Sequence, residues 1–529
     1  MINMKNFLVS AAVFFGICII YFVIMTSKTE GNFTYLLDDA YIHLALAKNF
    51  ALHGVWGMTP HEFSSSSSSP VFTFLISVLM RIFGNSGLIP LVINVLCAIG
   101  ILYFLTKYFR RISIKTNFIV LSVLFTVFSS ALHLQLFSGM EHLLQVLLVI
   151  LNIYFFTEWI SGNFKQRNSL YFFYGTILLL GLVRFEMMFY FVSLAFFLAL
   201  LKKFRESLLI LIFGLGPVLI FCYFNYQQTG HLFPNSVVVK GARIDFSGNV
   251  FGQIKDVLLS ALQNRSFYKR CLLPLLLLGA VIFADFKERK SLKEFYLKNF
   301  LLLAWAATLL LHSVFADLKS ILRYEAYLMV AFAMLILPRL TGYFEDFKTV
   351  SRKNYILTFL ILGNIVLMFS KVVFSHKILM YGSKNIYEQQ VQAGKFLHTY
   401  YNDTKVVAND IGAMSYYTDI HLFDIVGLGS PQIMEFNQRA DYSERSFGKY
   451  VGDYSKEQNY QLAIVYKEWL RGFVPAEWEE VAVLTIESNA VVSQPDVTVY
   501  CINPAIKKSL KNNIRKFNWN KNVKVRIIE

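Results

Sequence analysis

The chain has 529 residues, of which 56% are hydrophobic and 16% aromatic, including 51 Phe. This apolar content exceeds that of ordinary soluble proteins, so we expect a polytopic membrane protein. The formal net charge of +16 does not indicate a nucleic-acid partner. The Lys and Arg residues form no single basic face, and they gather in short runs between apolar segments, as in cytoplasmic loops.

Apolar runs predict about eleven membrane-spanning helices. The first, near residues 6–26, contains no small-residue cleavage site, so we expect an uncleaved span rather than a signal peptide. The others are expected near residues 88–106, 118–132, 143–157, 170–183, 187–201, 208–223, 271–284, 300–315, 326–337 and 355–370.

Two long loops, at residues 27–85 and 225–270, are expected on the extracytoplasmic side. The first loop holds an apolar stretch at 71–80 that is too short to cross a bilayer. If this stretch lies flat at the interface, the later basic clusters fall on the cytoplasmic side, whereas a crossing would invert them all. The positive-inside rule therefore favours a flat helix.

The composition changes near residue 376, where hydrophobicity falls and short β-rich runs begin at 405–408, 462–466 and 497–500. We therefore expect a transmembrane domain over residues 1–375 and a soluble α/β domain over 376–529. An odd number of spans places this soluble domain on the extracytoplasmic side, with the first loop. The predicted fold class is an α-helical polytopic membrane protein with a C-terminal α/β extracytoplasmic domain.

Two adjacent carboxylates, Asp38 and Asp39, follow the first span. Such a pair can be a solvated helix end, where Asp is common. At a membrane boundary, however, it is costly unless it faces a wet cavity, which makes it a candidate functional site. One carboxylate could accept a proton from a hydroxyl nucleophile, and the two together could hold a divalent cation, Mg²⁺ or Mn²⁺.

A run of serines, Ser64–Ser69, leads into Pro70. Serine-rich tracts are typical of flexible linkers. This run ends directly at an apolar helix, however, and Ser69-Pro70 predicts a helix start with the serine as its cap. The remaining hydroxyls could contact a sugar.

Charged residues recur where later spans end on the same outer side. They are Glu141, Arg184, Glu186 and Arg323. Boundary Arg–Glu pairs can neutralise each other. Alternatively, the arginines could bind an anionic ligand at this face, because arginine binds phosphate through two parallel hydrogen bonds.

The second outer loop contributes Asn235 and Lys240. Asn235 follows a proline, so this segment can be an ordinary Pro-Asn turn. Alternatively, the two side chains could reach a polar lipid headgroup.

Taken in chain order, these motifs resemble the GT-C superfamily of polytopic glycosyltransferases, which use polyprenyl-phosphate-linked sugars. They look most like the branch of the terminal arabinofuranosyltransferases. The matching stretches are Asp38–Ile42, Pro60–Glu62 before Ser68–Pro70, Ser138–Glu141, Arg184 with Glu186, Phe233–Ser236 with Lys240, Arg323-Tyr324, and Asp410–Ala413 with Asp424–Leu428.

The resemblance implies an inverting glycosyltransferase in a bacterial inner membrane, acting on a glycan or lipid acceptor of the cell envelope at the extracytoplasmic face. In such enzymes an acidic residue of the first outer loop is the base, which carries over to Asp39 in preference to Asp38. The substrate-binding residues are expected among Glu62, Glu141, Arg184, Glu186, Asn235, Lys240 and Arg323. Relatives tend to have an acidic and an aromatic residue where this chain has Ser65 and Ser67, so the resemblance carries no arabinose specificity.

Two other classes of function fit parts of the pattern. A transporter or flippase for a lipid-linked glycan would explain the helices and the boundary charges. A non-catalytic glycan-binding protein could have kept the same fold, because fold alone does not prove activity. Transporters usually contain internal repeats and polar helices near the middle of the membrane. This chain concentrates its polar groups at one face, which favours the enzyme. We find no Walker or dinucleotide glycine loop, so no nucleotide is expected.

Overall fold

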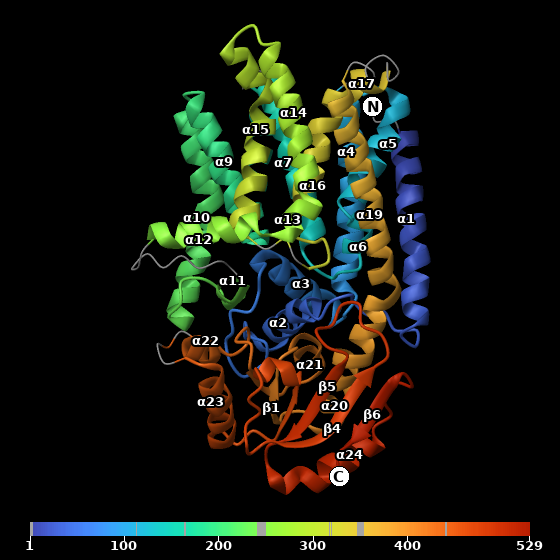
Figure 1. Cartoon of the computed structure of the whole chain (residues 1–529), viewed down its shortest axis with the longest axis vertical. Helices are drawn as coiled ribbons and strands as arrows, with labels where there is room; N and C mark the ends of the chain where they lie inside the picture. The colour runs from blue at the N-terminus through green and yellow to red at the C-terminus, as the bar shows by residue number, and fades with distance from the viewer. Residues whose placement is uncertain are drawn as a thin grey trace.

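The structure is a computed structural model that describes residues 4–112, 114–162, 165–240, 250–316, 318, 320–345, 354–437, 439 and 442–529. A bundle of long helices occupies one end of the molecule and a sheet domain the other, with α2 and α3 lying between them (Figure 1). The N-terminus lies at the far end of the bundle and the C-terminus in the sheet domain.

Each predicted span forms a helix, because long apolar runs satisfy their backbone hydrogen bonds internally in this conformation. Within the described residues, seven helices are long and apolar enough to cross a membrane. These spans, with the shorter bundle helices α5, α8, α9 and α14 and the C-terminal sheet, confirm the predicted class of a helical polytopic membrane protein with a C-terminal α/β domain. The extracytoplasmic side of that domain stays a prediction. The bundle helices are α1 (Met4–Ser27), α4 (Ile89–Arg111), α5 (Thr116–Ser129), α7 (His142–Ser161), α8 (Arg167–Val183), α9 (Met188–Leu200), α10 (Phe204–Thr229), α14 (Leu272–Lys287), α15 (Leu292–Phe315), α16 (Ala326–Ile336) and α19 (Tyr355–Ile386).

Short helices connect these spans. On the side of the sheet domain, the second outer loop folds into α11, α12 and α13 rather than remaining irregular. The connecting elements are α6 (Leu132–Gln135), η1 (Phe185–Met187), α11 (Asn235–Lys240), α12 (Val250–Leu262), α13 (Arg265–Arg270), η2 (Leu337–Leu340) and α17 (Thr341–Glu345).

Helix α2 (Asp39–His53) is buried along nearly its whole length. It ends at Gly54, whose φ of 71° lies in the left-handed region that glycine adopts without strain. A helix buried on all sides needs a partner on each face, and α2 has the bundle on one side and the sheet domain on the other (Figure 1). Helix α3 (Pro70–Phe83) packs beside α2, at the end of the bundle that faces the sheet domain, as expected for a stretch too short to cross.

The bundle and the sheet domain are joined by one unbroken helical stretch. Helix α19 continues through the π-helical segment η3 (Tyr387–Val391) into α20 (Gln392–Tyr400). The predicted domain boundary at 375/376 falls inside α19, so it marks a change of composition within a continuous helix. The division into two domains stays a prediction.

The C-terminal part contains a six-stranded sheet in the order β2-β1-β3-β5-β4-β6. Strand β1 pairs in parallel with β2 and β3, and the other neighbours are antiparallel. All three β-rich runs predicted from sequence are strands. The elements here are β1 (Lys405–Ala408), α21 (Gly412–Tyr417), β2 (His421–Asp424), α22 (Pro431–Asn437), α23 (Glu444–Glu457), β3 (Leu462–Val465), η4 (Lys467–Leu470), β4 (Glu479–Ile486), β5 (Asp496–Cys501), η5 (Pro504–Ile506), α24 (Lys507–Lys516) and β6 (Val523–Ile527).

A buried lysine on α2 holds the sheet domain against the first outer loop. The ammonium group of Lys48 donates to the carbonyls of Ser415, Tyr416 and Thr418 at 3.2, 3.2 and 2.8 Å. It also lies 3.0 Å from Oδ1 of Asp419. These carbonyls are at the C-terminal end of α21, where the helix dipole favours a cation. The first loop and the sheet domain therefore form one packed unit, at the end of the bundle predicted to carry both.

We predict that Lys48→Met destabilises the folded protein by about 1–3 kcal/mol, because three buried carbonyls would lose their donor. The melting temperature of the purified protein should fall by about 1–3 °C. Lys524→Met is the matched control, since the Lys524 side chain is 75% exposed and its ion pair with Glu487 is long, at 3.7 Å. Equal melting temperatures for the two variants would contradict this role of Lys48.

Candidate active site

Asp38 ties the first outer loop to the C-terminal domain. Its Oδ2 accepts the backbone N–H of Gly412 at 2.7 Å, and its Oδ1 accepts that of Ala413 at 2.8 Å. A side chain at position 412 would place its Cβ 2.2 Å from the Asp38 carbonyl oxygen, so only glycine allows this approach. Asp38 is buried and both of its carboxylate oxygens have a donor.

A third carboxylate, Asp410, lies near the pair. Its Oδ2 accepts hydrogen bonds from the Tyr466 hydroxyl and the Gln390 amide, both at 2.7 Å. Burial, and then the charge of Asp410, raise the pKa of Asp38, while the two backbone N–H groups act in the opposite direction. Burial also raises the pKa of Asp410. Negative charge is therefore costly at this site, and a cation beside any carboxylate that stays ionised is favourable.

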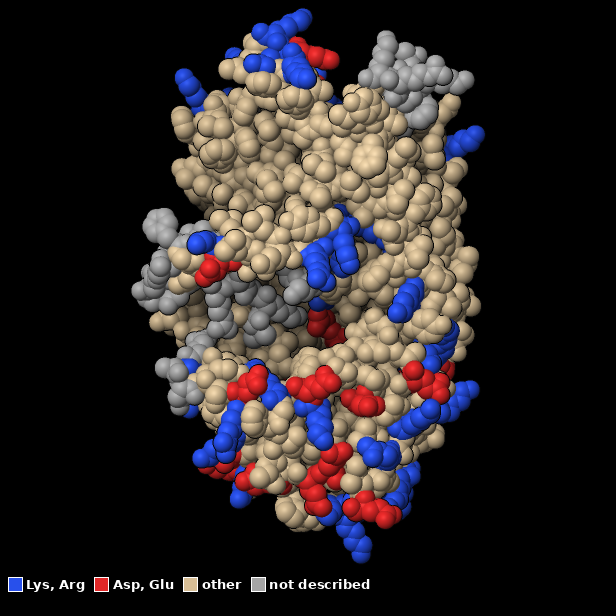
Figure 2. All heavy atoms as spheres, in the orientation of Figure 1, with Lys and Arg blue, Asp and Glu red and all other residues tan. Residues whose placement is uncertain are grey.

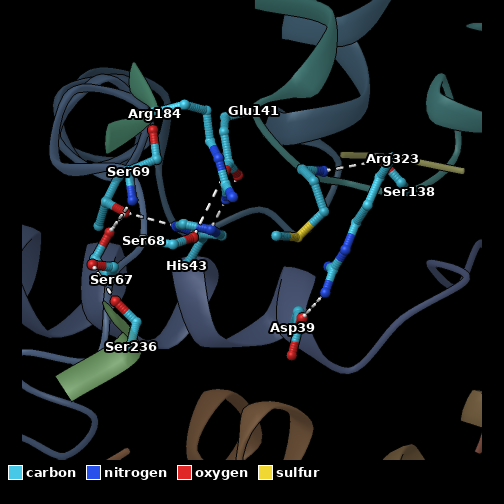
Figure 3. Close-up of polar contacts among 12 residues, drawn as sticks. Asp39, His43, Ser67, Ser68, Ser69, Ser138, Glu141, Arg184, Ser236 and Arg323 are labelled. Carbon is cyan, nitrogen blue, oxygen red and sulfur yellow. Dashed lines mark hydrogen bonds and ion pairs between the residues drawn. The ribbon is translucent and has the colours of Figure 1, made fainter. Parts of the chain in front are cut away.

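Asp39 pairs with a cation from the bundle, the guanidinium group of Arg323. Its Oδ2 lies 2.7 Å from Nη2 of Arg323, which precedes α16 (Figure 3). The Asp39 side chain is 27% exposed, whereas that of Arg323 is 6% exposed. Figure 2 shows a hollow between the bundle and the sheet domain, with acidic atoms deep inside it and Lys or Arg atoms on the bundle side. The adjacent aspartates therefore differ: Asp38 is fully engaged in structure and Asp39 is partly open.

The guanidinium group of Arg323 is only partly satisfied. Its Nη2 also donates to the Tyr324 hydroxyl at 3.0 Å. Its Nε and Nη1 are buried and have no hydrogen-bond partner within the described part of the chain. Buried donors without partners are costly, so this side chain offers N–H groups to an incoming oxyanion.

A second charged cluster begins one helical turn along α2. Nε2 of His43 lies 3.2 Å from Oε2 of Glu141, and Oε1 of Glu141 lies 2.7 Å from Nη1 of Arg184. Arg184 also binds Glu186 through Nε, at 3.0 Å, and through Nη2 (Figure 3). The guanidinium group of Arg184 thus pairs with two carboxylates, which agrees with the alternative that Arg–Glu pairs at the membrane boundary neutralise each other. It has fewer donors to offer a ligand than Arg323 has.

One aromatic ring links the two clusters. The guanidinium carbons of Arg323 and Arg184 lie 4.8 and 5.2 Å from the centroid of the Tyr324 ring. Cation–π contacts of this kind are favourable, and more so when they are desolvated. Tyr324 therefore helps to hold two positive charges close together.

The serine run is buried and hydrogen-bonded, so it is not a flexible linker. Ser66 donates to the Leu428 carbonyl at 2.7 Å, and the hydroxyls of Ser67 and Thr73 lie 2.8 Å apart. The predicted cap is wrong in its chemistry: Ser69 occupies the N-cap position of α3, but its hydroxyl makes no capping bond. Instead, its backbone N–H donates to the Ser67 hydroxyl at 3.1 Å.

Asn235 forms hydrogen bonds with two segments that are distant from it in the sequence. Its backbone N–H donates to the Ser65 carbonyl and its side-chain amide to the Leu428 carbonyl, both at 3.0 Å. The neighbouring Ser236 donates to the Ser67 carbonyl at 3.1 Å. The backbone N–H and the side-chain Nδ2 of Asn235 thus each bond within the protein, and a headgroup contact stays a prediction. The side chain of Lys240 lies outside the described residues.

Glu62 is not brought to this site. It is exposed in the first outer loop, and its electrostatic neighbours include His61 and the tyrosines Tyr454 and Tyr460 of the C-terminal domain. A ligand contact by Glu62 stays a prediction, separate from the Asp39–Arg323 pair.

Sequence reasoning assigned no site role to His43, Asp410 or Tyr324. The sequence predicted a loop here, whereas the segment is helix α2. The four-residue spacing from Asp39 to His43, which places both on one face of a helix, is the signal that could have found His43. The predicted Mg²⁺ or Mn²⁺ at Asp38 and Asp39 stays untested. Any such ion would compete with the two N–H donors that already occupy the Asp38 oxygens.

Comparisons with known proteins bear mainly on the fold. A family described as "Domain of unknown function (DUF8728)" matches residues 384–500. No curated protein matches the chain. The structure is similar to that of ArnT from Cupriavidus metallidurans bound to undecaprenyl phosphate, with a TM-score of 0.52 and 10% identity over 94% of this chain and 98% of that one. The apo structure of the same ArnT aligns with a TM-score of 0.49 and 10% identity, over 94% and 98% of the two chains. At this identity the first likeness shows the fold alone, and it agrees with the expected GT-C architecture.

We predict that Asp38→Ala lowers stability by about 1–3 kcal/mol, because the N–H groups of Gly412 and Ala413 would be left unpaired in a buried contact. Thermal melting of the purified protein measures the loss. Asp38→Asn should lose less, since it keeps one acceptor oxygen, and the exposed Asp453→Ala should lose nothing. An Asp38→Ala variant that melts like Asp453→Ala would contradict a structural role for Asp38.

Proposed function

We propose that this chain is an integral membrane inverting glycosyltransferase that moves a sugar from a polyprenyl-phosphate donor to a glycan or lipid acceptor. The reaction takes place at the extracytoplasmic face of a bacterial inner membrane. The observation that carries the proposal is the Asp39–Arg323 pair, in which a partly exposed carboxylate contacts a buried arginine whose Nε and Nη1 have no hydrogen-bond partner among the described residues.

Arg323 is the proposed phosphate ligand. Its free Nε and Nη1 suit the oxygen atoms of a phosphate, and its burial strengthens the interaction, since a charge-assisted hydrogen bond gains from a low dielectric. As the sugar–phosphate bond breaks, negative charge grows on the phosphate, and a fixed guanidinium stabilises that charge without reorganisation. The ArnT structure is described as bound to undecaprenyl phosphate, which supports a ligand of this class for the shared fold.

Asp39 is the proposed base. When phosphate replaces the carboxylate as partner of Arg323, the Asp39 side chain becomes available to accept the proton of the acceptor hydroxyl. The hydroxyl oxygen attacks the anomeric carbon while the bond from that carbon to the phosphate oxygen breaks. Polyprenyl phosphate leaves with the electron pair, and this single displacement inverts the anomeric configuration.

The other charged residues are proposed to position these two. His43 lies on the same helix as Asp39, and its contact with Glu141 connects α2 to the buried Arg184 and Glu186. The C-terminal domain covers the opposite side of α2, and we assign it to the acceptor. The proposal names no donor sugar, because the fold likeness does not single out the arabinofuranosyltransferase branch.

We predict that Asp39→Asn lowers the transfer rate by at least about 10²-fold, because the base is removed while a neutral partner remains for Arg323. The assay uses purified protein in nanodiscs with a panel of polyprenyl-phosphate sugars and envelope lipid extracts as acceptors. The exposed Asp453→Asn variant is the control and should keep full activity.

Transfer by Asp39→Asn at the rate of the control would refute the catalytic assignment. If the wild-type protein moved intact lipid-linked sugars across proteoliposomes and formed no glycosylated product, the flippase alternative would replace the enzyme.

A further inference from the structure

Two histidines and an aspartate meet on the surface, apart from the candidate active site. His61 comes from the first outer loop, Asp403 from the turn before β1, and His421 from the first position of β2. One potential ligand atom from each residue lies within 4.8 Å of the others. These residue types, imidazole nitrogens and a carboxylate, are a common ligand set for Zn²⁺.

The spacing of the three groups is close to that of a metal site. Nε2 of His421 lies 3.4 Å from Oδ1 of Asp403, and Nε2 of His61 lies 3.7 Å from the same oxygen. A tetrahedral zinc ion with ligand distances of about 2.0–2.1 Å holds neighbouring ligand atoms about 3.4 Å apart. The two distances to Asp403 thus need to change by a few tenths of an ångström at most.

The histidine rings are stacked, with centroids 3.7 Å apart and planes inclined by 12°. The lone pair of an imidazole nitrogen lies in the ring plane, so the lone pairs of two stacked rings lie in nearly parallel planes, and one ring must rotate for both nitrogens to point at one ion. The side chains of His61 and His421 are 30% and 40% exposed, which leaves room for that rotation and for entry of a hydrated ion. A water molecule would complete the four ligands.

One ring nitrogen of His61 also has a neighbour outside the cluster. Nε2 of His61 lies 2.9 Å from the carbonyl oxygen of Asp419. Zinc bound at Nε2 would replace this contact, and the ring proton would then be carried by Nδ1, as on the metal-bound histidines of many zinc sites.

We infer that His61, Asp403 and His421 bind a zinc ion that fastens the first outer loop to the edge of the C-terminal sheet. Strand β2 is the edge strand of that sheet, so the ion would clamp the domain at the same interface that Lys48 and Asp38 hold. The site does not depend on the proposed glycosyl transfer, and it is tested without any sugar substrate.

The test measures zinc content and melting temperature of the full-length protein in detergent, after incubation with zinc chloride and removal of the free ion. We predict one equivalent of zinc for the wild type and its loss in His421→Ala and in Asp403→Asn. Zinc should raise the melting temperature of the wild type by several degrees, because an ion that binds only the folded state stabilises it. His398→Ala, which removes an exposed histidine outside the cluster, should behave as the wild type.

Cobalt gives a second readout, since Co²⁺ bound to this site should show the intense visible absorption of a four-coordinate ion, which zinc then abolishes. The metal-free melting temperatures of all variants should agree, which separates lost binding from misfolding. A wild type that retains no zinc, or a His421→Ala variant that retains as much as His398→Ala, would overturn the inference.

Discussion

The structure depends on helix α2, which lies between a membrane bundle and a sheet domain and makes a charged contact with each. Successive positions around the start of a helix point in different directions, about 100° apart. Asp38 therefore reaches the backbone amides of Gly412 and Ala413, while Asp39 reaches the guanidinium of Arg323. The contact of Asp38 with Gly412 and Ala413 helps to fix the position of α2. It therefore sets the geometry of the partly exposed Asp39 carboxylate, although Asp38 takes no part in the proposed chemistry.

Buried charges maintain this arrangement at some cost. An ion taken out of water loses several kcal/mol of hydration, and breaking a buried pair leaves the remaining charge uncompensated. Arg184 meets this constraint with Glu141 and Glu186, and Lys48 meets it with carbonyls and Asp419. Arg323 meets it only in part, because two of its N–H positions have no partner in the described chain. The ion pairs of Arg184 and Lys48 thus hold their side chains in place, whereas the unsatisfied donors of Arg323 lie beside Asp39.

Much of the architecture could be predicted from sequence because it follows from local patterns. Long apolar runs became helices at the expected places, and the β-rich run beginning at Lys405 became a strand with the predicted limits. The roles of polar residues were harder to predict, since they depend on partners far along the chain. Ser66 and Asn235 both bond to the Leu428 carbonyl, a contact that no local pattern indicates. The difference between Asp38 and Asp39 likewise arises only when Gly412 approaches one of them.

The central claim is that the Asp39–Arg323 pair lies where a polyprenyl phosphate binds. A structure of the protein in nanodiscs with polyprenyl phosphate, determined by electron cryomicroscopy, tests it most directly. The account predicts density for the phosphate within hydrogen-bond distance of Nε or Nη1 of Arg323, with the prenyl chain leading outward toward the lipid. Phosphate density elsewhere in the molecule, with the Asp39–Arg323 pair unchanged, would contradict it.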